Sequence, residues 1–413
     1  MRSNYANKGL NYLLILFAFL LPISTAMTNA AVALLILFWL IEGRWKEKYT
    51  ILRSSLPFKL FLAFILLIGL SILWSHGIEG GFWGNKSPNA IVFYFRQYIF
   101  GFMIIPIILT SMRKEFIRYI ISSFLAAILV SELMSWGIFM EWIQYKDVSP
   151  DDPSPFMNHS FYSIFLAVAV FVLLTRFFQT KTTLYKVLIV LFILSAMVNL
   201  FLNGGRLGQL AFFVAIFVYI GLRYRVTAKS ILLSLLTISA VFTIAYKASP
   251  VFQKRMDLSL QSLQKITEGN YASSWGKRAQ ILTVAKDLVR ENPILGIGIG
   301  NAKVEFLEKA KECSQNRDFL LKVAHLHNGY MQILVELGIV GLLLFFFFLY
   351  RLLRIQLKRD DHILLVIVIT IYLVGFIGEP LFFNRKPYLL FNLFIAILLF
   401  KSMSRAKNKE ALE

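Results

Sequence analysis

Three basic or titratable residues lie where an apolar segment meets a polar one. Arg206 opens one apolar run, and His327 stands just before another. Arg278 falls on the apolar stripe of the segment between them. A guanidinium binds phosphate oxygens through two parallel hydrogen bonds, and a neutral imidazole accepts a proton near neutral pH. Together they predict a diphosphate site with a general base, where leaving-group charge is stabilised without a metal.

The neighbours of His327 are expected to support its role. Asn328 is a residue type that caps helices, so its side chain would fix the backbone on which His327 sits. A helix N-terminus and two arginines would disfavour the protonated imidazole. His325 would point off the same helical face, which makes it a weaker candidate. We therefore assign catalysis to His327, diphosphate binding to Arg206 and Arg278, and possible supporting roles to Asn328 and His325.

Each of these residues also has a structural interpretation. An arginine at a helix mouth can reach lipid headgroups, and a histidine at the end of a span can be interfacial. Gly338 and Gly341, which follow His327, favour close packing between helices over a role in the site. Asp151 and Asp152 lie among serines and prolines, a pattern typical of a rigid, solvated turn.

The composition indicates which elements position these residues. The 413-residue chain is 58% hydrophobic and only 16% charged, which a water-soluble core could not hide. Apolar runs of about 16 to 22 residues fit helices rather than barrel strands, because backbone groups in lipid must be satisfied internally. The predicted fold class is all-α, a polytopic integral membrane protein with about twelve transmembrane helices. The spans fall near residues 11–28, 29–42, 57–75, 92–112, 116–141, 157–175, 184–203, 207–222, 229–247, 329–350, 362–378 and 387–403.

The net charge of +20 would suggest a nucleic-acid partner in a soluble protein, but its distribution argues for a membrane. Basic residues gather in alternate connections and in the C-terminal tail, and such loops stay cytoplasmic. We expect both termini in the cytoplasm and no nucleic-acid partner. No cleavable signal peptide is evident. The single Cys313 allows neither an internal disulfide nor a thiolate metal site, which fits a bacterial inner membrane.

One external insertion is much longer than the other connections. It divides the chain into residues 1–247 with nine spans, the large periplasmic loop 248–326, and residues 327–413 with three spans and a cytoplasmic tail. Residues 275–291 within it predict a helix, with Arg278 central on the apolar face and in need of an anionic partner. Residues 303–317 predict a second, charged helix. The other external connections are 76–91, 142–156, 204–206 and 379–387.

The histidine segment also resembles a known family. His327-Asn328, nine residues, Gly338, two residues and Gly341, preceded by Asn292-Pro293-Ile-Leu-Gly-Ile-Gly, is similar to the O-antigen ligase and polymerase superfamily, most strongly over residues 275–345. The resemblance implies a GT-C-like membrane glycosyltransferase with no metal and no other cofactor. A ligase of that family transfers O-antigen polysaccharide from undecaprenyl diphosphate to lipid A core oligosaccharide in the periplasm, with inversion at the anomeric carbon.

The resemblance also implies roles for single residues. His327 would correspond to the family's proposed base, and Arg206 and Arg278 to the arginines assigned to the donor diphosphate. Arg206 matches by position rather than by motif. The alternatives are an O-antigen polymerase or related oligosaccharyltransferase of the same superfamily and, from another class, a lipid-linked glycan transporter. The histidine motif and the large loop favour the ligase, and charges gathered at the external face favour surface chemistry over transport.

Overall fold

The computed structural model describes residues 2–75, 90–323 and 325–410, and every regular element within them is helical. The predicted connection 76–91 lies mostly outside these residues. Eleven spans in the described ranges are long and apolar enough to cross a membrane. Ten consist wholly or mainly of one α-helix: α1 (Arg2–Ile23), α2 (Thr25–Glu42), α4 (Leu56–Leu70), α8 (Ile117–Phe139), α9 (His159–Gln179), α10 (Thr183–Leu202), α11 (Arg206–Tyr224), α12 (Ala228–Ala248), α17 (Gly329–Leu353) and α19 (Arg385–Glu410). The prediction of an all-α, polytopic membrane protein is confirmed.

The eleventh span is built from shorter pieces. It covers residues Ala90–Ser111 and joins α5 (Ala90–Tyr94), α6 (Phe100–Phe102) and α7 (Ile104–Ser111) through a π-helical turn. The predicted twelfth span corresponds to α18 (Arg359–Phe376), whose first turn holds three charged residues and which therefore falls outside the eleven. The short α3 (Trp45–Ser54) follows α2 and exposes Trp45 and Tyr49, as an interfacial helix does.

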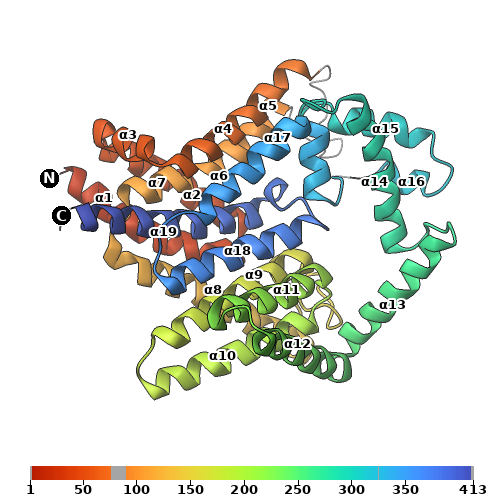
Figure 1. Ribbon diagram of the computed structural model, residues 1–413, viewed down its shortest axis with the longest axis horizontal. Helices are drawn as coiled ribbons and strands as arrows, with labels where there is room; N and C mark the ends of the chain where they lie inside the picture. Colours follow the sequence, from red (N-terminus) through yellow and green to blue (C-terminus); the bar gives the residue numbers. More distant parts are fainter. Residues whose placement is uncertain (1, 76–89, 324, 411–413) are drawn as a thin grey trace.

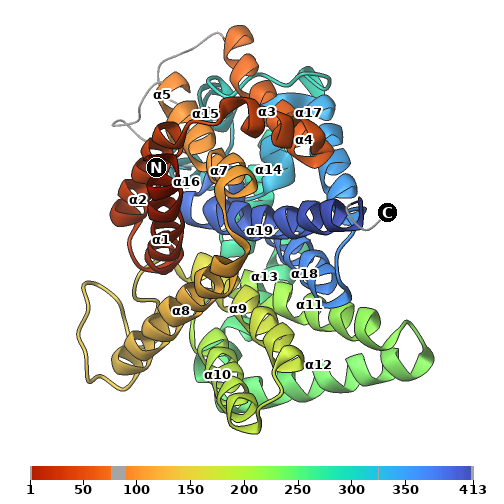
Figure 2. The same ribbon diagram turned by 90° about the vertical axis from the view of Figure 1, so that its left-hand side faces the viewer.

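The molecule has two distinct ends (Figure 1). Both termini and α3 lie at one end, which we call the terminal end. The opposite end carries α14 to α16, and we call it the insertion end. Helix α19 runs centrally between the group α1 to α7 and the group α8 to α12 (Figure 2). Its residues from 388 to 399 are buried, and apart from Tyr388 and Asn392 they are apolar on every side of the helix, as burial on all sides requires.

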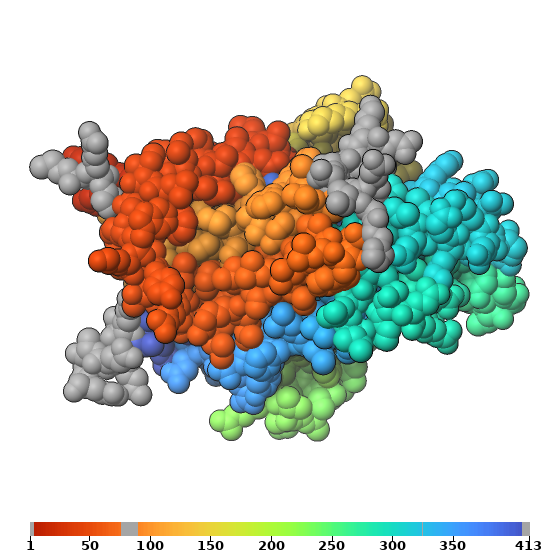
Figure 3. All heavy atoms as spheres, turned by 90° about the horizontal axis from the view of Figure 1, so that it is seen from above, coloured from red at the N-terminus to blue at the C-terminus, as the bar shows by residue number. Residues whose placement is uncertain are grey.

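Four helices lie between α12 and α17: α13 (Pro250–Thr267), α14 (Ser274–Glu291), α15 (Ala302–Lys311) and α16 (Arg317–Leu320). Seen from above, α14 to α16 gather at one end of the surface (Figure 3). The helix predicted over 275–291 is confirmed as α14, which the side chain of Ser273 caps. The prediction of a helix over 303–317 is wrong in length, because the helix found there, α15, is shorter. It ends at Lys311, and the chain turns at Asn316, whose φ is 53°.

Gly338 breaks α17 rather than forming a packing notch between helices, which corrects the interpretation from sequence. Its φ of 61° and ψ of −163° are non-helical. The loop that follows α14 supplies the lost hydrogen bonds: Ile339 N–H donates to Pro293 O at 2.9 Å, and Ile297 N–H donates to Val335 O at 2.8 Å. Irregular backbone at membrane depth needs such partners. The break therefore ties the helix that carries Arg278 to the helix that follows His327.

Candidate functional site

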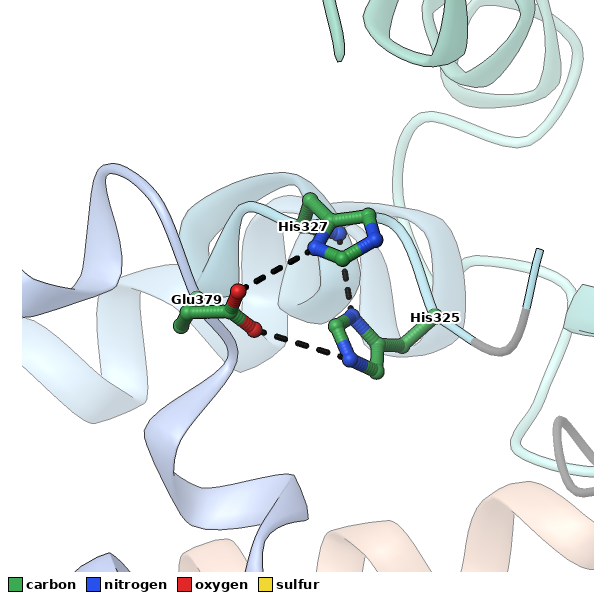
Figure 4. A group of neighbouring side chains, drawn as sticks. All are labelled: His325, His327 and Glu379. Atoms are coloured by element: carbon green, nitrogen blue, oxygen red, sulfur yellow. Dashed lines mark hydrogen bonds and ion pairs between the residues drawn. The ribbon is translucent and has the colours of Figure 1, made fainter. Parts of the chain in front are cut away.

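Glu379 is the carboxylate at which two of the predicted site residues meet. It follows α18, and its side chain is only 8% exposed. Its Oε1 lies 3.2 Å from Nδ1 of His327 and 3.5 Å from Nη2 of Arg278. Its Oε2 lies 3.5 Å from Nε2 of His325 (Figure 4). Arg278, whose side chain is 36% exposed, thus has the anionic partner that its position on an apolar stripe demands.

Both histidines face Glu379, so the prediction that His325 points away is wrong. That prediction assumed helical geometry, but residues 325–328 precede α17 and His327 has a φ of 48°. The two rings lie 4.2 Å apart between centroids. The backbone N–H of His327 also donates to Nδ1 of His325 at 3.3 Å. The left-handed residue turns both imidazoles to the same side of the chain.

Asn328 connects this turn to the segment that carries Glu379. Its side-chain oxygen accepts a hydrogen bond from Met331 N–H at 2.9 Å, so it is the N-cap of α17. Its side-chain nitrogen donates to the carbonyl of Ile377 at 3.0 Å. One side chain therefore starts the helix and also fixes the distance between the backbone of His327 and Glu379.

The electrostatics of the cluster favour an ionised carboxylate beside a neutral histidine. Burial alone would raise the pKa of Glu379, but the hydrogen bond from His327 and the charges of His325 and Arg278 hold that pKa below its ordinary value. Burial lowers the pKa of His325 to about 4, although Glu379 opposes this shift. The sequence interpretation placed only positive charge around His327. The structure corrects it, because a carboxylate lies against Nδ1.

Arg206 lies beside this cluster and not within it. It is half-buried at the start of α11, and its Nη1 donates to Oγ of Ser259 on α13 at 2.6 Å. It is close enough to Arg255 and Arg278 for their charges to repel it. In the described part of the chain, Arg206 makes no ion pair with a carboxylate and no direct contact with His327 or Glu379. Arg278 is therefore the predicted residue that both pairs with Glu379 and repels Arg206.

Residues 188–346 match the model of a family described as O-antigen ligase. This match supports an assignment to the O-antigen ligase family. The matched region runs from α10 into α17 and contains Arg206, Arg278 and both histidines, whereas Glu379 lies beyond it. Similarity to this family suggests a ligase- or polymerase-type glycosyltransferase that uses lipid-linked saccharides in a bilayer. No curated protein matches the chain.

The histidine cluster could also hold a metal ion. One ligand atom each from His325, His327 and Glu379 lies within 4.8 Å of the others, and zinc accepts such a set. The sequence interpretation assigned no metal ligands. Oε1 of Glu379 already faces Arg278 at 3.5 Å, so a guanidinium would lie beside the bound cation. Repulsion between these positive charges favours the hydrogen-bonded cluster over a metal centre.

Glu379 is the site residue that sequence reasoning missed. It was noted only as the start of an external connection. The available signal was a lone acidic residue between Gly378 and Pro380, directly after an apolar run. A carboxylate at that position needs a cationic or hydrogen-bonded partner, but the sequence does not show that His327 is the partner, 52 residues away.

Asp152 was also misjudged as part of a solvated turn. Its Oδ1 accepts a hydrogen bond from Gly204 N–H at 2.9 Å, and its Oδ2 lies 2.6 Å from Nδ1 of His159. Its side chain is only 25% exposed. Asp151, by contrast, is exposed as predicted. The two aspartates differ because only Asp152 faces the Gly204-Gly205-Arg206 turn.

Proposed function

We propose that the protein is an O-antigen ligase, which transfers O-antigen polysaccharide from undecaprenyl diphosphate to lipid A core oligosaccharide. The observation that carries this proposal is the meeting of Arg278 and His327 at Glu379, with Arg206 close by. It supplies a base and two phosphate-binding groups within one region of the insertion end. The family match supports a lipid-linked saccharide donor.

The proposed location is the bacterial inner membrane, with both termini cytoplasmic and residues 248–326 on the periplasmic side. Two features support it. Both termini lie at the end opposite α14 to α16 (Figure 1), and the basic connections alternate with external ones along the sequence. The donor's lipid tail would remain in the bilayer while its diphosphate reaches the arginines at the insertion end.

In the proposed reaction His327 is the general base. Its Nδ1–H donates to Glu379, which leaves Nε2 free to take the proton from the acceptor hydroxyl. The hydroxyl oxygen bonds to the anomeric carbon as the bond between that carbon and the diphosphate oxygen breaks. Undecaprenyl diphosphate leaves with the bonding electrons, and its charge is stabilised by Arg206 and Arg278. Attack opposite the leaving group inverts the anomeric configuration.

Glu379 would act through His327 without touching either sugar. It selects the tautomer with the proton on Nδ1, holds the ring in place and stabilises the imidazolium that forms. Because its pKa is lowered, the carboxylate is ionised near neutral pH and can serve in this way.

The second candidate is a polymerase of the same superfamily, which the family match supports equally. A gene deletion separates the two. Loss of a ligase leaves polymer on undecaprenyl diphosphate, whereas loss of a polymerase leaves core oligosaccharide capped by a single repeat unit. A transporter is disfavoured because the charged cluster includes Arg278 of α14, and α14 lies at the insertion end (Figure 1), whereas transporters hold paired charges near the membrane midplane.

The decisive test is transfer by purified protein in lipid nanodiscs. The reaction contains a lipid-linked glycan and lipid A core oligosaccharide, with and without a chelator. We expect glycan on the lipid A core in both reactions, and its loss in His327→Ala. His362→Ala, which changes a histidine at the start of α18, is the matched control and should remain active. Glycan joined to glycan on the carrier would identify a polymerase, and transfer by His327→Ala at the normal rate would refute the proposed base.

A further inference from the structure

The turn before α11 is bordered by a second group of charged side chains. Asp152 engages this turn through the N–H of Gly204 and also binds His159, so both of its oxygens are occupied. His159 is the first residue of α9. The turn, α9 and the segment before it are therefore held together by one carboxylate.

Arg255 of α13 extends over the same turn. An idealised Cβ added to Gly204 would lie 3.1 Å from Nη2 of Arg255 and 3.2 Å from Oδ2 of Asp152. Burial would raise the pKa of Asp152, but the bonds from His159 and Gly204 and the charge of Arg255 lower it. Even so, the ion pairs found in the described ranges do not join Arg255 to a carboxylate. The charge of Asp152 attracts Arg255, but the N–H groups of Arg255 remain available to another acceptor.

Arg255 and Arg206 are also linked through α13. Arg206 donates to Oγ of Ser259, and that hydroxyl donates to the carbonyl of Arg255 at 2.7 Å. Both guanidinium groups are half-buried, and their charges repel each other. Holding two like charges together in a partly desolvated place is unfavourable unless an anion binds between them. The arrangement is therefore suited to a ligand with negative charge on several oxygens.

We propose that Arg255 is a third diphosphate-binding residue, which together with Arg206 makes the site select a lipid diphosphate over a lipid monophosphate. This inference rests on the proposed function, since it assigns a further contact to the same donor. Arg278 and Arg206 hold one phosphoryl group, and Arg255 with Arg206 holds the other. Asp152 is a positioning residue that keeps Arg255 over the glycine turn.

The experiment measures binding of undecaprenyl diphosphate and undecaprenyl monophosphate to the full-length protein in nanodiscs. Arg255→Gln should weaken diphosphate binding by about tenfold or more, because it removes charge-assisted hydrogen bonds. Its affinity for the monophosphate should change by less than about threefold, since one phosphoryl group keeps its partners. Lys254→Gln is the matched control, because it removes the same charge from an exposed neighbour on α13 and should bind both lipids normally.

Arg255→Lys distinguishes charge from shape. A lysine keeps the charge but lacks the planar fork, so we expect a loss of diphosphate affinity between those of the wild type and Arg255→Gln. If Arg255→Gln binds the diphosphate as the wild type does, the inference about Arg255 is overturned and the proposed function stands. If the wild type fails to bind the diphosphate, the proposed function fails and this inference fails with it.

Discussion

The terminal end and the insertion end differ in whether their half-buried and buried charged side chains have partners of opposite charge. At the terminal end, Glu42 is fully buried and lies 3.0 Å from Nζ of Lys48, whose side chain is 3% exposed. Asp361 lies 2.6 Å from Nζ of Lys401 in the same part of the molecule. Each buried carboxylate there has a basic partner on the chain itself. Their charges are cancelled within the protein.

At the insertion end the balance is reversed. Arg206 and Arg255 have no carboxylate partner within ion-pair distance in the described ranges. Arg278 shares the single carboxylate of Glu379 with two histidines. Positive charge is therefore in excess around the two histidines, within the region that matches the family. The difference indicates that the paired charges Glu42–Lys48 and Asp361–Lys401 maintain the fold, and that Arg206 and Arg255 are available for an anionic ligand.

The most damaging change should be His327→Ala. Losing a general base lowers a transfer rate by about a hundred- to ten-thousandfold, while the backbone and α17 remain in place. We expect a normal melting temperature and no capped lipopolysaccharide on silver-stained gels. A normal lipopolysaccharide ladder would show that the cluster at Glu379 is structural, like the pairs at the terminal end.

Arg206→Ala should have the second-largest effect on the transfer rate. It removes a group that stabilises leaving-group charge, which we expect to lower the rate by about a hundredfold. The measurement is the transfer rate in nanodiscs. Arg223→Ala, at the other end of α11 and paired with Asp360 at 2.6 Å, is the comparison. Equal effects of the two variants on the rate would remove the distinction between the ends.

Glu42→Gln tests the terminal end. The change leaves Lys48 buried and without its charge partner, which should lower the free energy of unfolding by about 3 kcal/mol. Activity per folded molecule should not change. Chemical denaturation in detergent measures the first quantity and the transfer assay the second. Adding Lys48→Met should restore stability, and a loss of specific activity without loss of stability would contradict a structural role.

The smallest effect should come from His325→Asn. The pKa of His325 is about 4 in the folded protein, against its ordinary value of 6.5. As the pH falls below 6.5 the unfolded chain binds a proton that the folded chain does not, so stability declines toward the folded pKa. From about pH 7 to about pH 5 the loss is roughly 2 kcal/mol. The asparagine oxygen can still accept the N–H of His327.

The measurement for His325→Asn is the melting temperature at each pH. The variant should lose less stability on acidification than the wild type. Glu379 does not affect this comparison. Because its pKa is below the ordinary value of 4.5, its contribution to the free energy of unfolding stays constant as long as the pH is above 4.5. If the melting temperatures of the two proteins fall equally with decreasing pH, His325 is not buried as a neutral group.

The sequence predicts well whatever depends on neighbouring residues. Apolar runs predict the spans, the apolar stripe of α14 predicts that Arg278 has an anionic partner, and Asn328 before an apolar run predicts a helix cap. What it cannot predict depends on contacts between distant segments. The break at Gly338 is stable only because residues 293–297 pair with it, and Glu379 is recognisable only once His327 lies beside it.

The prediction for the turn at His327 was wrong for a different reason. A φ of 48° is uncommon for a residue other than glycine, so helical spacing was the reasonable assumption for His325. The positive φ is what makes two histidines converge on one carboxylate. A local pattern does not reveal it, because the surrounding structure imposes it.

In the proposed mechanism the arginines and His327 surround a lipid diphosphate at the insertion end. The most direct test is an experimental structure of the protein in nanodiscs with undecaprenyl diphosphate bound. We expect phosphate oxygens at about 3 Å from the guanidinium groups of Arg206 and Arg278, with Nε2 of His327 facing the position of the anomeric carbon. A diphosphate bound elsewhere, with these three side chains turned away from it, would refute the proposed mechanism.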